Sequence, residues 1–325
     1  MLRIKDLFHE IFTEAIHLSA MLFKIMIPVS IFVKIIQATG LIYYIGLGLS
    51  PIMHLTGLPG EMGIVWATGM LSNLYGGIIA MLSIPETASL TVAQITILTT
   101  MMLIAHTFLI ELVIARKSGI KLMVMFLLRF GFAFIVGLIL HLIYSSFDLL
   151  ENTTHAFASK FVVPPSESIL EWSVGQLKNY FFVFVMILSL VALIKLLKSL
   201  GLVDLMTKLL SKPLRLLGIG EHAITITIIG LTLGISYGGA MIIKESQKAE
   251  ITKREIFHAM LLMGLCHSVF EDTILVMSLG GHWSGVLLIR VIFAFIITWG
   301  FAYFTAKMSD VKFNKYLMVK DKQVL

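Results

Sequence analysis

The chain has 325 residues, of which 58% are hydrophobic and only 14% are charged. A soluble domain of average composition carries roughly 25% charged residues, so this composition excludes an ordinary soluble protein and predicts a polytopic membrane protein. The net charge is +6, but the basic residues gather between apolar runs, which is typical of membrane orientation and not of nucleic-acid binding. The single cysteine, Cys266, excludes an intrachain disulfide.

The predicted elements begin with an amphipathic N-terminal segment that shows no small-residue cleavage site, so we predict no removable signal peptide. Eight apolar segments follow, and each is as long as the roughly 20 residues that a membrane span needs. In the first half of the chain these segments are 17–40, 61–83, 92–115 and 121–146. In the second half they are 178–200, 222–244, 255–280 and 283–306.

Two of these segments carry glycines and polar residues in their middle. The first contains GMLSNLYGG at 69–77, and the second contains GLTLGISYGG at 230–239. Glycine weakens a helix interior by about 1 kcal/mol, and backbone leaves the helix at membrane depth only where protein or water covers it. We therefore predict re-entrant hairpins at 61–83 and 222–244.

The distribution of Lys and Arg supports this interpretation. Residues 41–91 contain no Lys or Arg, whereas the stretches 195–215 and 244–255 are rich in them. Basic residues gather on the cytoplasmic side, yet a spanning 222–244 segment would place these two stretches on opposite sides. With both hairpins re-entrant, every basic cluster and both termini are cytoplasmic, and the acidic linker 147–175 is external.

The two halves of the chain also repeat each other. A shift of 161 residues places His106 on His267, and a small gap brings Tyr75-Gly76-Gly77 onto Tyr237-Gly238-Gly239. Because each half has three spans and one hairpin, the halves are predicted to be inverted, as in many transporters. The fold class is thus an all-α integral membrane protein with six spans and two hairpins. The predicted regions are 1–16 (amphipathic), 17–146 (repeat 1), 147–175 (linker), 176–306 (repeat 2) and 307–325 (cytoplasmic tail).

Polar side chains at the centres of the two hairpins are the first candidate substrate site. Freed backbone groups and helix ends at membrane depth suit polar or charged ligands. The alternative is that these side chains only satisfy the broken backbone. The candidates are Ser72, Asn73, Tyr75, Ser236 and Tyr237.

A second set of candidates lies in the middle of two spans. His106 and Thr107 match His267 and Ser268 across the repeat. Intramembrane ionisable residues usually face the bundle interior and mark a pathway, so these four residues join the predicted substrate site. The alternative is a hydrogen bond that fixes the hairpin to the span.

Metal ligation is a further alternative for the same region. Glu271 lies one helical turn after His267 and would share its face, and Cys266 is adjacent. A His, carboxylate and thiol set of His106, Cys266, His267 and Glu271 would suit a metal path. Our main prediction is a site without a metal.

Two arginines lie inside predicted spans, where an unpaired charge costs several kcal/mol. Arg129 is predicted at the depth of Glu111, and Arg290 at the depth of Asp272; the shift of 161 relates the two pairs. We therefore predict Glu111–Arg129 and Asp272–Arg290 as structural ion pairs. The alternative is that both carboxylates face the substrate cavity and bind a cation.

The order of span, hairpin, span and span, duplicated and inverted, resembles the nucleoside-recognition or gate domain family. That pattern is shared by concentrative nucleoside transporters, the membrane part of the ferrous-iron permease and spore-maturation membrane proteins. The resemblance covers nearly the whole chain and implies a site between the hairpin tips. Nucleoside transporters carry Gln/Glu or Asn/Glu signatures at these tips. Since the tips here lack a carboxylate, the resemblance implies the location of the site and not its ligand.

The sequence contains no catalytic signature such as HExxH, GxSxG or Walker A, and we predict that the chain is not an enzyme. We predict a secondary-transporter-like protein of the cytoplasmic (inner) membrane that moves a small polar solute, with a nucleoside-like solute favoured. A divalent metal permease and a non-transporting scaffold or assembly factor are the alternatives. The expected partners are the solute and the bilayer, with no nucleic acid and no cofactor; a coupling ion (sodium or proton) and homo-oligomerisation are left open.

Overall fold

The structure is a computed structural model. It describes residues 38–84, 87, 89–153, 168–199, 202–246 and 251–319, together with residues 10–13, 15, 16, 19, 20, 23, 27, 28, 31 and 35. The chain divides into two compact units, one formed by Met1–Phe32 with Pro164–Leu209 and the other by Val33–Val163 with Leu210–Leu325. Each unit is described by itself.

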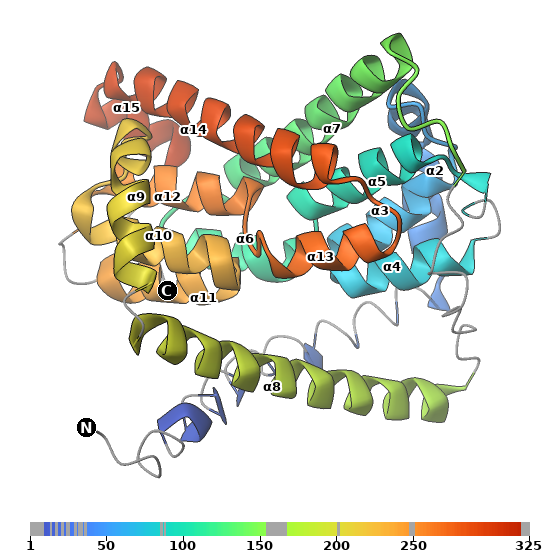
Figure 1. The fold of residues 1–325 in the computed structure, drawn as a ribbon, viewed down its shortest axis with the longest axis horizontal. Helices are drawn as coiled ribbons and strands as arrows, with labels where there is room; N and C mark the ends of the chain where they lie inside the picture. The colour runs from blue at the N-terminus through green and yellow to red at the C-terminus, as the bar shows by residue number, and fades with distance from the viewer. Residues whose placement is uncertain are drawn as a thin grey trace. The chain divides into compact units, whose positions relative to one another are not determined.

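The described part of the chain is helical, with two isolated β-bridges and no strand (Figure 1). The first half of the larger unit contains α2 (Leu41–Leu55), α3 (Met62–Leu71), α4 (Leu74–Ser83), α5 (Val92–Ile104), α6 (Phe108–Lys117) and α7 (Leu122–Ser146). Its second half contains α10 (Glu221–Leu233), α11 (Ile235–Ser246), α12 (Lys253–Leu265), α13 (Glu271–Ser278), the π-helix η3 (Ser284–Ile289), α14 (Arg290–Ala306) and α15 (Asp310–Leu317).

The smaller unit is built on α8 (Ile169–Ser199), which begins inside the segment predicted as the linker 147–175. Lys195 Nζ of α8 lies 2.7 Å from Glu10 Oε1, and the rings of Phe12 and Phe184 pack edge to face. The helix α9 (Leu202–Leu216) connects this unit to the larger one.

Three stretches of helix in the described residues are long and apolar enough to cross a membrane: Val92–Lys117, Leu122–Ser146 and Ser284–Ala306. A fourth is obtained if the pair Lys208–Leu216 and Glu221–Thr232, bent by 107°, counts as one span. The first predicted segment, 17–40, lies largely outside the described residues. The chain is therefore a helical membrane protein with several candidate spans.

Both glycine-rich segments break into two helices that pack on each other, α3 against α4 and α10 against α11 (Figure 1). A Cβ on Gly77 would lie 3.0 Å from Gly69 Cα, and a Cβ on Gly238 would lie 2.5 Å from Gly230 Cα. Only glycine allows this approach of two backbones. The pairs correspond at the shift of 161 without a gap, so Gly77 matches Gly238 and the gap placed there by the sequence alignment is wrong.

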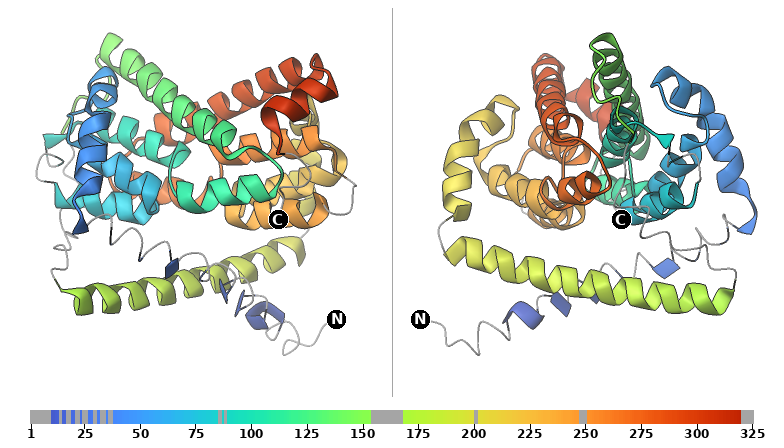
Figure 2. Two further views of the ribbon diagram at one scale, coloured as in Figure 1. Left: turned by 180° about the vertical axis from the view of Figure 1, so that it is seen from behind. Right: turned by 45° about the vertical axis from the view of Figure 1, so that its right-hand side comes forward.

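The repeat is also visible in the helix starts and in the packing of the larger unit. Capping boxes begin α5, from Thr91 and Gln94, and α12, from Thr252 and Glu255. The helix α5 packs on α7 and η3, and correspondingly α12 packs on α14 and α7. The rings of Phe132 on α7 and Phe293 on α14 touch, and both helices lie along the same side of this unit in every view (Figure 2). The halves are thus built alike and interlock.

The segments 92–115 and 255–280, predicted as continuous spans, are both interrupted. The first is split into α5 and α6 around residues 105–107, and the second into α12 and α13 around residues 266–270. Neither interruption contains Gly or Pro. They are stabilised by side chains from other helices, described below.

We expect the Gly230–Gly238 contact to tolerate no side chain. Gly238→Ala should destabilise the protein by about 1–3 kcal/mol, because the added methyl group meets backbone and Met263 Sδ. The matched control is Gly300→Ala in α14, where a Cβ has open space and alanine favours the helix by about 1 kcal/mol. Chemical unfolding in detergent micelles measures both variants, and equal stability of the two would contradict the close packing.

Candidate functional site

The two interrupted spans have the same local geometry. After α5 ends at Ile104, Thr107 takes a left-handed φ of 54°, and after α12 ends at Leu265, Ser268 takes a φ of 46°. Left-handed backbone is uncommon outside glycine, and these two residues occupy equivalent positions in the two repeats. Each break frees carbonyl groups at the end of a buried helix, and such groups need hydrogen-bond donors.

Arg129, from the neighbouring helix α7, supplies the donors at the first break. Its Nε donates to the Ile104 carbonyl at 3.0 Å and its Nη2 donates to the His106 carbonyl at 3.2 Å. The guanidinium is fully buried and also forms an ion pair with Glu111 through Nη1. The predicted Glu111–Arg129 contact is therefore present, and the arginine additionally stabilises the broken backbone.

Arg290 of α14 repeats this arrangement at the second break. Its Nε donates to the Leu265 carbonyl at 3.4 Å and its Nη2 donates to the His267 carbonyl at 2.5 Å. The structure describes both side chains, and Asp272 does not form the predicted ion pair with Arg290. The aspartate side chain is one methylene shorter than that of Glu111, and Arg290 Nη1 stays buried without a hydrogen-bond partner among the described residues.

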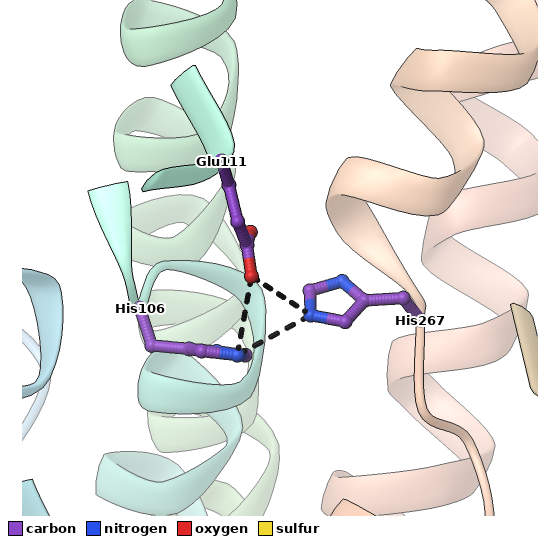
Figure 3. A group of neighbouring side chains, drawn as sticks. All are labelled: His106, Glu111 and His267. Atoms are coloured by element: carbon purple, nitrogen blue, oxygen red, sulfur yellow. Dashed lines mark hydrogen bonds and ion pairs between the residues drawn. The ribbon is translucent and has the colours of Figure 1, made fainter. Parts of the chain in front are cut away.

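His106 and His267 lie in the breaks and point at each other (Figure 3). His106 Nδ1 is 2.9 Å from the Met102 carbonyl, and His267 Nδ1 is 2.8 Å from the Met263 carbonyl. A carbonyl only accepts, so both Nδ1 atoms carry the hydrogen. The two Nε2 atoms face each other at 3.2 Å, and both side chains are buried. The histidines thus meet directly across the repeat.

Glu111, in the first turn of α6, completes this cluster. Its Oε1 lies 3.3 Å from His267 Nε2 and 3.6 Å from His106 Nε2, while its Oε2 faces Arg129 (Figure 3). The carboxylate is buried like the two rings. One ligand atom from each of the three residues lies within 4.8 Å of the others, so the arrangement suits a proton or a cation.

Two residues proposed as metal ligands, Cys266 and Glu271, are not part of this cluster. The helix is interrupted between His267 and Glu271, so the two residues do not lie on one face of a continuous helix. Glu271 Oε1 instead accepts from the Tyr75 hydroxyl at 3.4 Å, and the Cys266 thiol is buried. The expected sharing of one helical face was therefore wrong.

At the tip of the first hairpin, Asn73 satisfies broken backbone. Its Oδ1 accepts from Gly76 N at 2.8 Å and caps α4. Ser72 is half-buried beside it, and the Tyr75 hydroxyl reaches α13 in the other half of the chain. At the second tip, the side chains of Ser236 and Tyr237 lie outside the described residues.

One backbone hydrogen bond joins each hairpin to a break. Thr107 N donates to the Gly69 carbonyl at 3.0 Å, and Val269 N donates to the Leu231 carbonyl at 2.9 Å. Ser268 lies beside Gly234 at the second tip. The structure therefore brings hairpin tips, breaks and histidines into one region.

Sequence reasoning missed that Glu111 joins the two histidines. The main prediction paired Glu111 with Arg129, a cation-binding role for Glu111 was kept as the alternative, and the carboxylate expected beside His267 was Glu271. The shift of 161 that superposes His106 on His267 was the available signal, because two repeat-related residues contact each other when they lie on the axis that relates the halves. Glu111 follows His106 by five residues and was within reach of that meeting point.

Fold and site together define a helical membrane protein whose helices break around a buried cluster of ionisable side chains. A family model described as "Gate: Nucleoside recognition" matches residues 19–121. The protein YvoD of Bacillus subtilis (strain 168), described as an uncharacterized membrane protein, is 30% identical over 287 residues, covering 86% of this chain and 89% of YvoD. No solved structure matches the chain. The chain belongs to the nucleoside-recognition Gate family of membrane proteins.

We expect Arg129→Met to destabilise the protein by about 3–5 kcal/mol, because Glu111 is then a buried charge without its cation. Adding Glu111→Leu should recover part of this loss, since no orphan carboxylate remains. Arg116→Met, at the exposed end of α6, is the control and should change stability by less than about 0.5 kcal/mol. Denaturant unfolding of the three variants checks this, and a double variant no more stable than Arg129→Met would argue against the orphaned charge.

Proposed function

We propose that this chain is a secondary-transporter-like membrane protein that moves a small polar solute past its broken helices. The observation that carries the proposal is the buried contact of His106 with His267, 161 residues apart, where the two halves meet. Ionisable groups inside a membrane are costly and usually mark a pathway. The family description, nucleoside recognition, favours a nucleoside-like solute.

In this proposal the two hairpins act as gates. Each is closed on itself by a glycine contact, which lets it move as one body, and a backbone hydrogen bond joins each to its break. Gating of rigid elements around a central site is the usual route to alternating access. The proposed solute site is lined by Ser72, Tyr75, Thr107 and Ser268 together with the two histidines; the predicted side chains of Ser236 and Tyr237 lie outside the described residues.

We further propose that the larger arrangement is six spans and two hairpins in inverted halves, within the cytoplasmic membrane and with both termini cytoplasmic. The matched breaks, caps and glycine contacts support the duplication, and the Lys and Arg distribution supports the orientation. In this proposal a sodium ion or a proton drives transport. The Gate family is associated with transport rather than catalysis.

A second candidate is passage of a divalent metal ion, the alternative noted from the sequence. It is favoured by one observation, the cluster of His106, Glu111 and His267. In that case the ion is the substrate, and the cluster lies on its path. Flux measurements with each class of substrate separate the two candidates.

We expect purified protein in proteoliposomes to take up radiolabelled uridine or adenosine, driven by a sodium or proton gradient. Tyr75→Phe should reduce uptake about tenfold, because it removes the hydroxyl that joins α4 to Glu271 across the halves. The matched control is Tyr43→Phe, whose ring is exposed on α2 and which should leave uptake unchanged. Uptake of nucleosides, bases and divalent metals no faster than in protein-free liposomes would favour a scaffold role instead.

Cysteine labelling tests the proposed topology. In a Cys266→Ala background, single cysteines at positions 61 and 83 should react with an impermeant reagent from the outside, and cysteines at 222 and 244 from the inside. The reason is that each hairpin enters and leaves on one side. Labelling of 61 and 83 from opposite sides would replace the hairpin by a span and remove the inverted repeat.

A further inference from the structure

We infer that His106, Glu111 and His267 bind one divalent transition-metal cation. The inference deepens the proposed function by assigning a ligand to its central cluster, and it holds whether the ion is cargo or stays bound. The three side chains are buried and come from the breaks and first turn of two different helix pairs. Figure 3 shows both rings and the carboxylate pointing to one place.

The hydrogen positions on the two imidazole rings indicate that a positively charged species, a proton or a cation, is bound between them. Because each Nδ1 donates to a carbonyl, of Met102 or Met263, each neutral ring presents the lone pair of Nε2. These two lone pairs face each other at 3.2 Å, and Glu111 Oε1 lies 3.3 Å and 3.6 Å from them. Among the described residues three acceptors therefore converge with no donor between them, and a proton or a cation removes their repulsion.

The spacing of the three atoms fits a metal ion. An ion placed about 2.1 Å from each atom, the usual distance for zinc with nitrogen or oxygen, would see the two Nε2 atoms at an angle of about 100°. The same placement gives about 104° between Glu111 Oε1 and His267 Nε2, and about 118° between Oε1 and His106 Nε2. These angles are close to tetrahedral and leave a fourth position open.

The groups around the three ligands are those that support a metal site. Metal-bound histidines usually donate their second nitrogen to a carbonyl, and ligating carboxylates are themselves held by hydrogen bonds or charge. Here the carbonyls of Met102 and Met263 orient the rings. Arg129 holds Glu111 Oε2 and leaves Oε1 directed at the histidines. All three supporting contacts are already formed.

Two imidazoles and one carboxylate select the class of cation. Imidazole suits zinc, iron, copper and nickel, whereas calcium and magnesium prefer sites made wholly of oxygen. We therefore expect binding of Zn²⁺, Co²⁺ or Fe²⁺, and no comparable binding of Mg²⁺ or Ca²⁺.

The test uses Co²⁺ with the purified full-length protein in detergent, after treatment with a chelator. We expect one Co²⁺ per chain with the visible d–d absorption of a four-coordinate site, and a rise in the melting temperature with Co²⁺ but not with Mg²⁺. His106→Gln and His267→Gln should each weaken Co²⁺ binding by more than about 100-fold, the upper end of the effect of a changed supporting contact. The matched control is His258→Gln, a buried histidine that bonds the Gly218 carbonyl and Thr305, and it should retain Co²⁺.

The variants are compared only if they elute as single species and unfold cooperatively without metal. The melting shift of the unaltered protein tests the inference independently of any variant. Absence of Co²⁺ binding and of a melting shift in the unaltered protein would overturn the inference and leave a proton shared between the histidines. Equal binding by His106→Gln and His258→Gln would overturn it as well. Nucleoside uptake without Co²⁺ binding would remove the metal site alone, and Co²⁺ binding without uptake of any substrate would remove the transport proposal alone.

Discussion

Buried backbone carbonyls at the two helix breaks are the constraint on which the site depends. Inside a membrane each unsatisfied backbone group costs several kcal/mol, so a broken helix needs donors at a fixed place. An arginine carries five N–H donors in a rigid fork. Arg129 therefore serves two carbonyls and one carboxylate at the same time. Because this arginine belongs to α7 and not to the broken helix, packing between helices determines where the chain leaves helical geometry.

The breaks in turn determine what the two halves present to each other. A histidine inside a regular helix projects sideways from the helix. His106 and His267 instead follow the last turn of a helix, and each bonds a carbonyl of that turn. The glycine contacts in the hairpins let the tips lie against the same breaks. The Tyr75–Glu271 hydrogen bond then crosses from one half to the other. The candidate site is thus assembled from both halves.

The sequence was sufficient for the class of protein, the positions of both hairpin breaks, the repeat and the pairing of Glu111 with Arg129. Those features can be predicted from the composition, the glycine positions and the distribution of charged residues along the chain. The breaks at His106 and His267 were missed because no Gly or Pro marks them; they are stabilised by a residue on another helix. The prediction of an Asp272–Arg290 ion pair was wrong. It rested on the matched depth of the two residues in the membrane, which does not take the length of the side chains into account.

Glu111 contacts both histidines, whereas its repeat counterpart Asp272, also buried but one methylene shorter, forms no ion pair with either of them, although the architecture around the two acids is duplicated. Two identical half-length chains assembled as a symmetric dimer would present the same acid twice, because each surface patch appears on both partners. A dimer of that kind has either two carboxylates beside the histidines or none. Joining the halves in one polypeptide lets the two acids diverge, so that one carboxylate and not two contacts the pair of histidines.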